Sequence, residues 1–269
     1  MPSPHQVALY TFGNHSPGWL ETVHENLKAE PWGKNLKVLE LYLRINFEIA
    51  KQQQKVYEDD SAGIAIWRAG FLVTPTMDPV WMYYERNNPK YPQKWNFKGV
   101  KIGETPLQGI TVDISNYSVK YDPPEFKPKW EIYIDPRNFK HILEDNKERL
   151  SRALGESIVN NQHFLFRAVY GELMLERKEA AGVINQWYMD GYNFLMPLSL
   201  TDPDKVDLTA ALTIDEPNKR YQLRTLLLPH YAYANARAIV KSKAQLSSWA
   251  ILDETILDSE SYEEDGEEE

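Results

Sequence analysis

Residues 221–240, YQLRTLLLPHYAYANARAIV, are the stretch on which the predicted fold depends. The segment begins as a leucine-rich apolar run, which predicts a strand over 221–228. The run stops at Pro229, and the alanine- and tyrosine-rich segment that follows predicts a helix over 230–242. A strand followed directly by a helix therefore closes the fold, ahead of a short segment that ends at Trp249.

Further strands precede this pair. Two of them, GYNFLMPLSL at 191–200 and DLTAALTI at 207–214, are apolar runs of strand length, and the turn DEPNKR connects the second to 221–228. Other segments mix branched and aromatic residues or alternate in the manner of strands, and these are 63–75, 80–84, 95–102 and 130–135.

Helical periodicity, with apolar residues three or four positions apart, appears in three longer segments, 35–56, 138–154 and 156–181. Asn35 is a candidate N-cap for the first of them. The second and third follow Pro136 and are separated near Gly155, where glycine favours a break. The predicted helices cover 35–56, 138–154 and 156–181, with a shorter one within 19–29.

These elements predict an α+β fold, a single domain with a mostly antiparallel sheet and helices packed on it. The sequence shows no internal repeat and no Pro/Gly-rich linker that would divide it. We expect an irregular N-terminal segment over 1–34, the α+β domain over 35–252 and an acidic disordered tail over 253–269. Within the domain, 103–129 contains four prolines and is expected to be a long surface loop.

The composition restricts the class of protein. The chain has 269 residues and no cysteine, so disulfides, thiolate metal sites and a cysteine nucleophile are excluded, and a reducing compartment fits. The start of the chain lacks a basic segment followed by an apolar one, and the apolar runs are far shorter than a membrane span. We therefore expect a soluble cytoplasmic protein with no membrane partner.

The net charge of −9 is concentrated at one end of the chain. Residues 253–269 contain 10 of the 39 acidic residues and no Lys or Arg. The rest of the chain has 30 basic residues against 29 acidic ones, a balance that neither demands nor forbids a nucleic-acid partner. The acidic tail favours solubility, and a second interpretation is that it mimics phosphate and covers a basic groove.

The motifs of common nucleotide and hydrolase sites are absent. The sequence has no GxxxxGK[ST], GxGxxG, GxSxG or HExxH segment, and whether the protein uses a cofactor stays unknown. No metal site is expected, because metal-ligand spacing is missing among the six histidines, His5, His15, His24, His141, His163 and His230.

The segment DPRNFKHILEDNKERL, 135–150, places polar groups along one predicted helix face. Four of them are three, four and four residues apart: Asn138, His141, Asp145 and Arg149. Asp145 could orient His141 as a catalytic general acid or base, and Arg149 could bind phosphate in bidentate fashion. The alternative is a solvated helix face with ordinary ion pairs, such as Asp145 with Arg149.

The segment INQWYMDGYNF, 184–194, carries polar groups in or beside an apolar strand. Buried amides need hydrogen-bond partners. The side chains of Gln186, Tyr188 and Asn193 therefore either face a ligand or bond to backbone groups of the fold.

The helix after Pro229 pairs its polar and aromatic residues one turn apart, Tyr233 with Arg237 and Tyr231 with Asn235. Tyrosine stacked on bases with arginine on phosphate would suit nucleic acid. The alternative is a core-packed amphipathic helix with an arginine at its rim.

Aromatic and basic residues also alternate in WMYYERNNPKYPQKW, 81–95, which includes Arg86, Lys90 and Lys94. Such a mixture suits single-stranded nucleic acid. It suits a protein interface as well.

Taken in order, several segments resemble a bacterial family of domains of unknown function, the one numbered 3825. The resemblance runs from about Leu36 to Trp249. It rests on NLKVLELYLRINFEIAKQQQKV at 35–56, AIWRAGFLVTPTMDPVWMYYERN at 65–87, KHILEDNKERL at 140–150, NQWYMDGYNFLMPLSL at 185–200 and LLLPHYAYANARAIV at 226–240. The chain departs from the family pattern at Asn185, where the family has proline, and at Arg68 and Ala69, which replace an Asn-Thr pair.

The resemblance implies a context and a set of residues, but it names no reaction. Family members are often joined to cold-shock or other OB-fold modules, which implies an RNA context by association. The residues that the resemblance marks as special are His141, Asn146, Arg149, Gln186, Tyr188, Asn235 and Arg237.

Three hypotheses follow. The first is a nucleic-acid-associated protein that binds RNA or a nucleotide in a pocket lined by 138–149, 186–193 and 231–237. The second is an enzyme acting on a nucleotide or phosphorylated ligand, with His141 as the acid/base and Arg149 or Arg237 on phosphate. The third is a protein-interaction module without catalysis. The substrate and the oligomeric state stay open.

Removal of residues 253–269 should leave the thermal transition nearly unchanged, because a segment rich in like charges has little to bury. A large fall in melting temperature would show that the tail packs. If the tail masks a basic groove, truncation should also raise the affinity for nucleic acid at low salt, and unchanged affinity would remove the masking idea.

Overall fold

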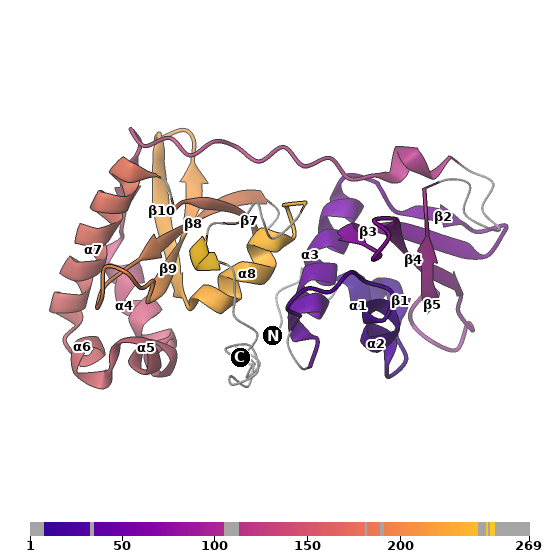
Figure 1. Ribbon diagram of the computed structural model, residues 1–269, viewed down its shortest axis with the longest axis horizontal. Helices are drawn as coiled ribbons and strands as arrows, with labels where there is room; N and C mark the ends of the chain where they lie inside the picture. The colour runs from indigo at the N-terminus through magenta and orange to yellow at the C-terminus, as the bar shows by residue number, and fades with distance from the viewer. Residues whose placement is uncertain are drawn as a thin grey trace. The chain divides into compact units, whose positions relative to one another are not determined.

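The computed structural model describes residues 8–32, 35–104, 113–180, 182–188, 191–241, 246 and 248–250. The chain divides into two compact units, and the boundary between them lies at Tyr121 and Asp122. We call them the N-terminal unit and the C-terminal unit and describe each by itself (Figure 1).

The N-terminal unit is a five-stranded sheet with helices against it. Its sheet has the order β1-β5-β4-β3-β2, with β1 parallel to β5 and the other neighbours antiparallel. The elements are α1 (Ala8–Phe12), β1 (Gly13–Asn14), α2 (Trp19–His24), α3 (Lys37–Gln52), β2 (Tyr57–Asp59), β3 (Ile64–Val73), β4 (Pro79–Arg86), β5 (Trp95–Ile102) and the 3-10 helix η2 (Ile114–Tyr117).

Helix α3 packs on β3 through its apolar face, and the Phe47 and Trp67 rings meet with centroids 5.1 Å apart. The contact is close because Gly70 has no side chain. A Cβ atom at Gly70, whose φ is +58°, would lie 2.2 Å from Oδ1 of Asn46 and 2.6 Å from the Tyr42 hydroxyl. That hydroxyl accepts the backbone N–H of Phe71, so the bend in β3 is bonded directly to α3.

The C-terminal unit has a second five-stranded sheet with the order β6-β10-β9-β8-β7. Strand β6 is parallel to β10, and the other neighbours are antiparallel. The elements are β6 (Glu131–Tyr133), α4 (Pro136–Asp145), α5 (Lys147–Leu154), α6 (Glu156–Asn160), α7 (Gln162–Glu179), β7 (Ile184–Tyr188), β8 (Gly191–Leu198), β9 (Leu208–Asp215), β10 (Arg220–Leu227), α8 (Pro229–Arg237) and the 3-10 helix η4 (Ser248–Ala250).

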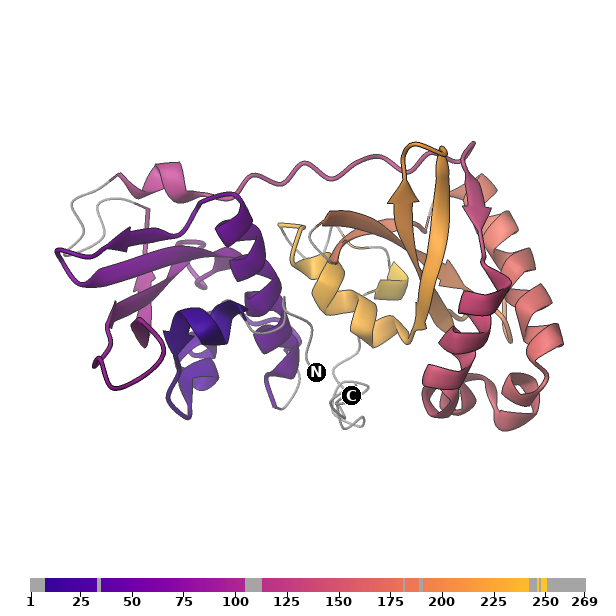
Figure 2. The same ribbon diagram turned by 180° about the vertical axis from the view of Figure 1, so that it is seen from behind.

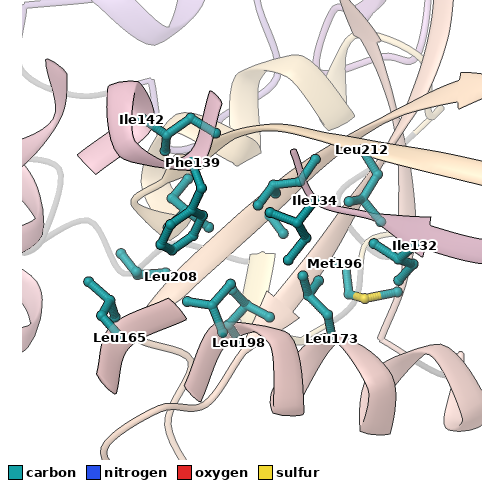
Figure 3. Close-up of a cluster of buried hydrophobic side chains, with 14 of the residues drawn as sticks. Ile132, Ile134, Phe139, Ile142, Leu165, Leu173, Met196, Leu198, Leu208 and Leu212 are labelled. Atoms are coloured by element: carbon teal, nitrogen blue, oxygen red, sulfur yellow. The ribbon is translucent and has the colours of Figure 1, made fainter. Parts of the chain in front are cut away.

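Helices cover both faces of this second sheet. Helices α4 and α7 lie on one side and α8 on the other, and the view from behind shows the same layers (Figure 2). The larger core lies on the α4 and α7 side, where leucine and isoleucine side chains of the helices meet those of β6, β8 and β9 (Figure 3). The residues labelled there are Ile132, Ile134, Phe139, Ile142, Leu165, Leu173, Met196, Leu198, Leu208 and Leu212.

The two units share one strand order. In each, a short first strand lies at the edge of the sheet, helices follow, and four antiparallel strands return so that the last lies parallel to the first. The last long helix before the four strands packs on the second of them in both units, α3 on β3 and α7 on β8. This repeat of topology is not visible in the sequence, because the two halves use different residues to build it.

The α+β class and the mostly antiparallel pairing are confirmed. The strands form two sheets, however, and not the one sheet expected. The strands of each half bond among themselves, and the described part of 103–129 contributes no strand that would join the sheets. Within 1–34, α2 falls inside the short helix expected over 19–29. The tail predicted for 253–269 lies outside the described residues.

Three local predictions about helices are wrong. The helix expected over 156–181 is divided at Asn161 into α6 and α7. Asn35 is not the N-cap of α3; the buried Leu36 precedes the helix with a φ of 54°, and no side chain caps it. Burial of an apolar side chain therefore fixes the start of α3. The helix expected over 138–154 is two helices, because Asn146 leaves the helical conformation with φ −113° and ψ 14°.

His15 is enclosed by the aromatic core of the N-terminal unit. Its ring lies 4.5 Å from that of Trp19 and stacks on Phe97 at 5.7 Å, and its Nε2 is 3.1 Å from the Tyr84 hydroxyl oxygen. Burial lowers the pKa of His15 from 6.5 to about 4. The folded state therefore favours the neutral imidazole.

This depressed pKa makes stability depend on pH in a defined window. Above pH 6.5 the imidazole is neutral in both states, but below it the unfolded chain binds a proton that the folded unit resists down to about pH 4. Lowering the pH from about 7.5 to about 5 should therefore cost roughly 2 kcal/mol through this group. His15→Phe keeps an aromatic ring in this place, but it cannot bind a proton, so the part of the pH dependence of stability that His15 causes should be lost. Urea unfolding at both pH values tests it, and an equal pH effect in wild type and variant would contradict it.

Candidate functional site

In the C-terminal unit, polar side chains predicted from three separate segments meet where α8 packs on β7. Helix α8 starts at Pro229 after the extended residue Leu228, so the chain turns directly from β10 into the helix. Its alanines, among them Ala232 and Ala236, are fully buried and allow the backbone to approach the sheet closely. This approach brings the polar residues of α8 within reach of the strands.

The first contact is a pair of amides. Nδ2 of Asn235 donates a hydrogen bond of 3.1 Å to Oε1 of Gln186. Gln186 is 1% exposed, whereas Asn235 is half-buried. On the neighbouring strand, Asn193 is the register partner of Gln186. Three amide side chains from α8, β7 and β8 are therefore neighbours.

The second contact lies one helical turn earlier on α8. The guanidinium carbon of Arg149, on α5, lies 5.4 Å from the centroid of the Tyr231 ring, within the range of a cation–π interaction. Both residues are half-buried. Tyr231 and Asn235 are four residues apart and share a face of α8. We call the set Arg149, Tyr231, Asn235, Gln186 and Asn193 the polar cluster.

Several predicted site residues also have bonds that hold the fold. Nδ2 of Asn146 donates to the carbonyl of Ile142 at 2.6 Å, at the break between α4 and α5. The Asn193 amide donates to the Tyr188 carbonyl at 2.8 Å and so joins β8 to the end of β7. Such bonds are the structural alternative to ligand binding for these residues.

Arg237 and Tyr233, at the end of α8, are buried. Arg237 is 1% exposed, and its Nη1 donates to the Val240 carbonyl at 2.7 Å, where the chain leaves the helix. Tyr233 is fully buried against the sheet. The prediction that these two residues bind a ligand therefore has less structural support than the same prediction for Asn235.

His141 is placed differently from its expected neighbours. Its side chain is 70% exposed on α4, and its nearest ion-pair partner is Glu144, with Nδ1 3.9 Å from Oε2. The expected partnership with Asp145 is absent from the bonds among the described residues, and Arg149 lies on the next helix. Tyr188 is likewise outside the polar cluster and is 44% exposed at the end of β7.

The hairpin of β4 and β5 forms a second surface of interest, in the N-terminal unit. Cations lie over aromatic rings along it, with Lys101 Nζ 4.7 Å from the Tyr83 centroid and Lys90 Nζ 4.9 Å from that of Tyr91. Beside the loop that joins the two strands, the Lys94 ammonium lies over Trp95, but it also bonds to Glu58 at 2.8 Å. Nearby carboxylates therefore neutralise part of this basic surface.

Sequence reasoning named Tyr231 only as the helical neighbour of Asn235 in a predicted pocket and did not connect it with Arg149. The signal was its spacing of four from Asn235 on one helix. Its contact with Arg149 could not be derived, because that residue comes from a helix whose start depends on the break at Asn146.

The polar cluster combines the groups that recognise a small polar, aromatic ligand: a cation stacked on a ring, and amides that both donate and accept hydrogen bonds. Among the described residues, no group of three or more His, Asp or Glu side chains could hold a metal ion. No described helix has the length and apolar character that crossing a membrane requires.

The fold and the cluster define an α+β protein with two sheets of like strand order and a polar site beside the last helix. The chain belongs to the family DUF3825, a domain of unknown function, whose model matches residues 23–246. No curated protein and no solved structure matches the chain. The family match spans both units and confirms the resemblance seen in the sequence.

The amide pair should show energetic coupling. Asn235→Ala would leave the buried Gln186 carbonyl without its donor from α8, at a cost of about 1–3 kcal/mol. The double variant with Gln186→Ala should cost less than the sum of the singles by roughly 1 kcal/mol. Urea unfolding of the four proteins measures the coupling.

A matched control pairs Gln186→Ala with Asn218→Ala. Asn218 is exposed and bonds to Asp215 in the turn between β9 and β10. That pair should be additive, and additive costs for Gln186 and Asn235 as well would contradict a bond between them.

Proposed function

We propose that the C-terminal unit binds a nucleotide, either free or within single-stranded RNA, at the polar cluster. The observation that carries the proposal is the line of groups from Arg149 through Tyr231 and Asn235 to Gln186, which joins α5, α8 and β7. Segments far apart in the sequence supply these groups.

Each group in the cluster matches one part of a nucleotide. The guanidinium of Arg149 is suited to phosphate oxygens through paired hydrogen bonds. The Tyr231 ring offers a surface for base stacking, and the half-buried Asn235 amide, which the buried Gln186 holds in place, can donate to and accept from a base edge. Arg149 and Tyr231 are already stacked, so little side-chain freedom would be lost on binding.

The charge balance indicates a short ligand. With 30 basic residues against 29 acidic ones outside the tail, the chain offers no excess charge to follow a long phosphate backbone. A single arginine in the cluster fits one phosphate contact, for which affinity should fall with salt at a log–log slope of only about −0.7. Such ligands occur in the cytoplasm, the compartment that the cysteine-free composition favours.

The two other hypotheses have weaker support. An enzyme with His141 as acid/base would need that side chain oriented toward the ligand, and it is 70% exposed beside Glu144 at 3.9 Å. A purely structural role for the polar cluster, as a link between α8, β7 and α5, is the main alternative to binding. Binding and stability must therefore be measured on the same variants.

Arg149→Ala should reduce affinity about tenfold or more, a loss of about 1.4 kcal/mol or more, because the charged group on the phosphate is removed. The measurements are calorimetry with nucleoside monophosphates and fluorescence anisotropy with short RNA and DNA oligomers at two salt concentrations. Binding of the monophosphate would identify a free nucleotide as ligand, and binding restricted to oligomers would identify a strand.

Arg152→Ala is the matched control. Arg152 is on the same helix, is 56% exposed and pairs with Glu148 at 2.7 Å, so its loss should change neither affinity nor melting temperature appreciably. Arg237→Ala should instead destabilise the unit by about 1–3 kcal/mol, because it removes a buried side chain and leaves the Val240 carbonyl without its donor. Unchanged affinity in Arg149→Ala and Tyr231→Ala would overturn the proposal, as would early unfolding of both.

A further inference from the structure

Helix α7 has two apolar stripes, of which one is buried. Leu165, Val169 and Leu173 are fully buried in the core of the C-terminal unit. The second stripe consists of Phe164, Ala168, Gly171 and Leu175, and we call it the outer stripe. A helix that is apolar on two sides has a surface that its own unit does not cover.

The outer stripe is exposed at its large residues. Phe164 is 55% exposed and Leu175 is 59% exposed. Gly171 lies between them in the helix interior, where glycine costs about 1 kcal/mol relative to alanine. A Cβ atom there would meet nothing within 4 Å, so no contact within the described structure requires the glycine. An exposed apolar stripe with an open glycine is typical of a surface that another helix approaches closely.

The spacing of the outer stripe is that of a helix–helix seam. Its members are four, three and four residues apart and lie within about 60° of one another around the helix. The buried stripe is centred about 130° further round, so the two do not overlap. The outer stripe is therefore a separate surface and not an edge of the core.

We propose that α7 packs against α7 of a second copy of this chain, in parallel, through the outer stripe. The proposal is independent of nucleotide binding. In a parallel two-fold pair each layer of the seam contains the same residue from both copies. The layers would be Phe164, Ala168, Gly171 and Leu175, large at both ends and small in the middle, so the helices can approach closely at the centre.

The charges beside the outer stripe favour this partner and this direction. Arg167 flanks the stripe on one side and Glu172 on the other, five residues later. In a parallel pair, flanking residues with that separation face each other across the seam, so Arg167 of each copy would meet Glu172 of the other. Arg167 is exposed and forms no ion pair with any residue that the structure describes. Glu172 also accepts the backbone N–H of Ser199 at 3.2 Å, which fixes its position.

An antiparallel pair would bring like charges together. The flank that carries Glu172 also carries Glu176 and Glu179, and in an antiparallel arrangement the same flanks of the two copies face each other. Within one copy these carboxylates already interact unfavourably, since burial and then Glu172 and Glu179 raise the pKa of Glu176. The pattern therefore selects the parallel arrangement.

The seam is short, and its length sets the expected strength. The twelve residues from Phe164 to Leu175 span roughly 16 Å, and the seam they form is smaller than a standard stable interface. We expect a dimer with a dissociation constant in the micromolar range. Covalent capture is the suitable test, because it detects a weak but specific pairing.

The chain contains no cysteine, so a single introduced cysteine reports on one position. Full-length Gly171→Cys under mild oxidation should give a disulfide-linked dimer, because the parallel pair places the two positions opposite each other within disulfide range. Tyr170→Cys is the matched control: it is 46% exposed on the same helix but lies about 100° away from Gly171, and it should remain monomeric. Equal cross-linking of both variants, or of neither, would overturn the proposal.

Two further measurements fix the direction and the energetics. A mixture of Ala168→Cys and Gly171→Cys should give mostly the two like dimers, whereas an excess of the mixed dimer would show antiparallel pairing and refute the proposed direction. By light scattering at micromolar concentration, Phe164→Glu should abolish the wild-type dimer, and Tyr170→Glu should retain it. A wild-type chain that is monomeric at the highest soluble concentration would contradict the proposal.

Discussion

The central strands of the C-terminal unit are buried on both faces, and much of the unit's organisation depends on this constraint. In β8, the successive residues Phe194, Leu195 and Met196 point to alternate faces, yet all are buried. Helices α4 and α7 cover one face and α8 covers part of the other. A polar side chain that is buried on these strands, or on the edge strand β7 beside them, is stabilised by a partner inside the protein. Gln186 bonds to Asn235 of α8 and Asn193 bonds to the Tyr188 carbonyl at the end of β7, and the polar cluster therefore lies at the boundary of the core.

The N-terminal unit has the same strand order, but different side chains pack its helix against its sheet. Its helix α3 reaches the sheet through the contact between Gly70 and Asn46, and aromatic rings take the place that leucine and isoleucine occupy in the other core. The shared order with unlike packing explains why a repeat is plain in the topology and not in the residues. The two candidate surfaces belong to different units, the hairpin of β4 and β5 to the N-terminal unit and the polar cluster to the C-terminal unit.

The sequence predicted most strands because their signals are local. The runs at 95–102 and 207–214 have strand composition whatever their neighbours, and β5 and β9 are found there. The division of 138–154 into two helices was not predicted. It depends on the hydrogen bond from the Asn146 side chain to the Ile142 carbonyl, and the spacing of apolar residues carries no information about that bond. The contact of Asn235 with Gln186 joins residues 49 positions apart, so no spacing rule could give it. The number of sheets was missed for the same reason, since pairing between distant strands is decided by packing.

The parallel edge strands have a consequence for how the protein is made. In each unit the first strand pairs with the last, β1 with β5 and β6 with β10, so each sheet is closed by segments from opposite ends of its own sequence. Contacts of such high sequence separation form late and slow folding. During synthesis, β5 emerges well before the C-terminal unit is complete, so the N-terminal unit can close its sheet first. The C-terminal unit must wait for β10 and α8, and until then the face of its sheet that α8 packs against stays uncovered, although α4 and α7 have already been synthesised. Co-translational protection of this half of the chain would then matter more than protection of the first half.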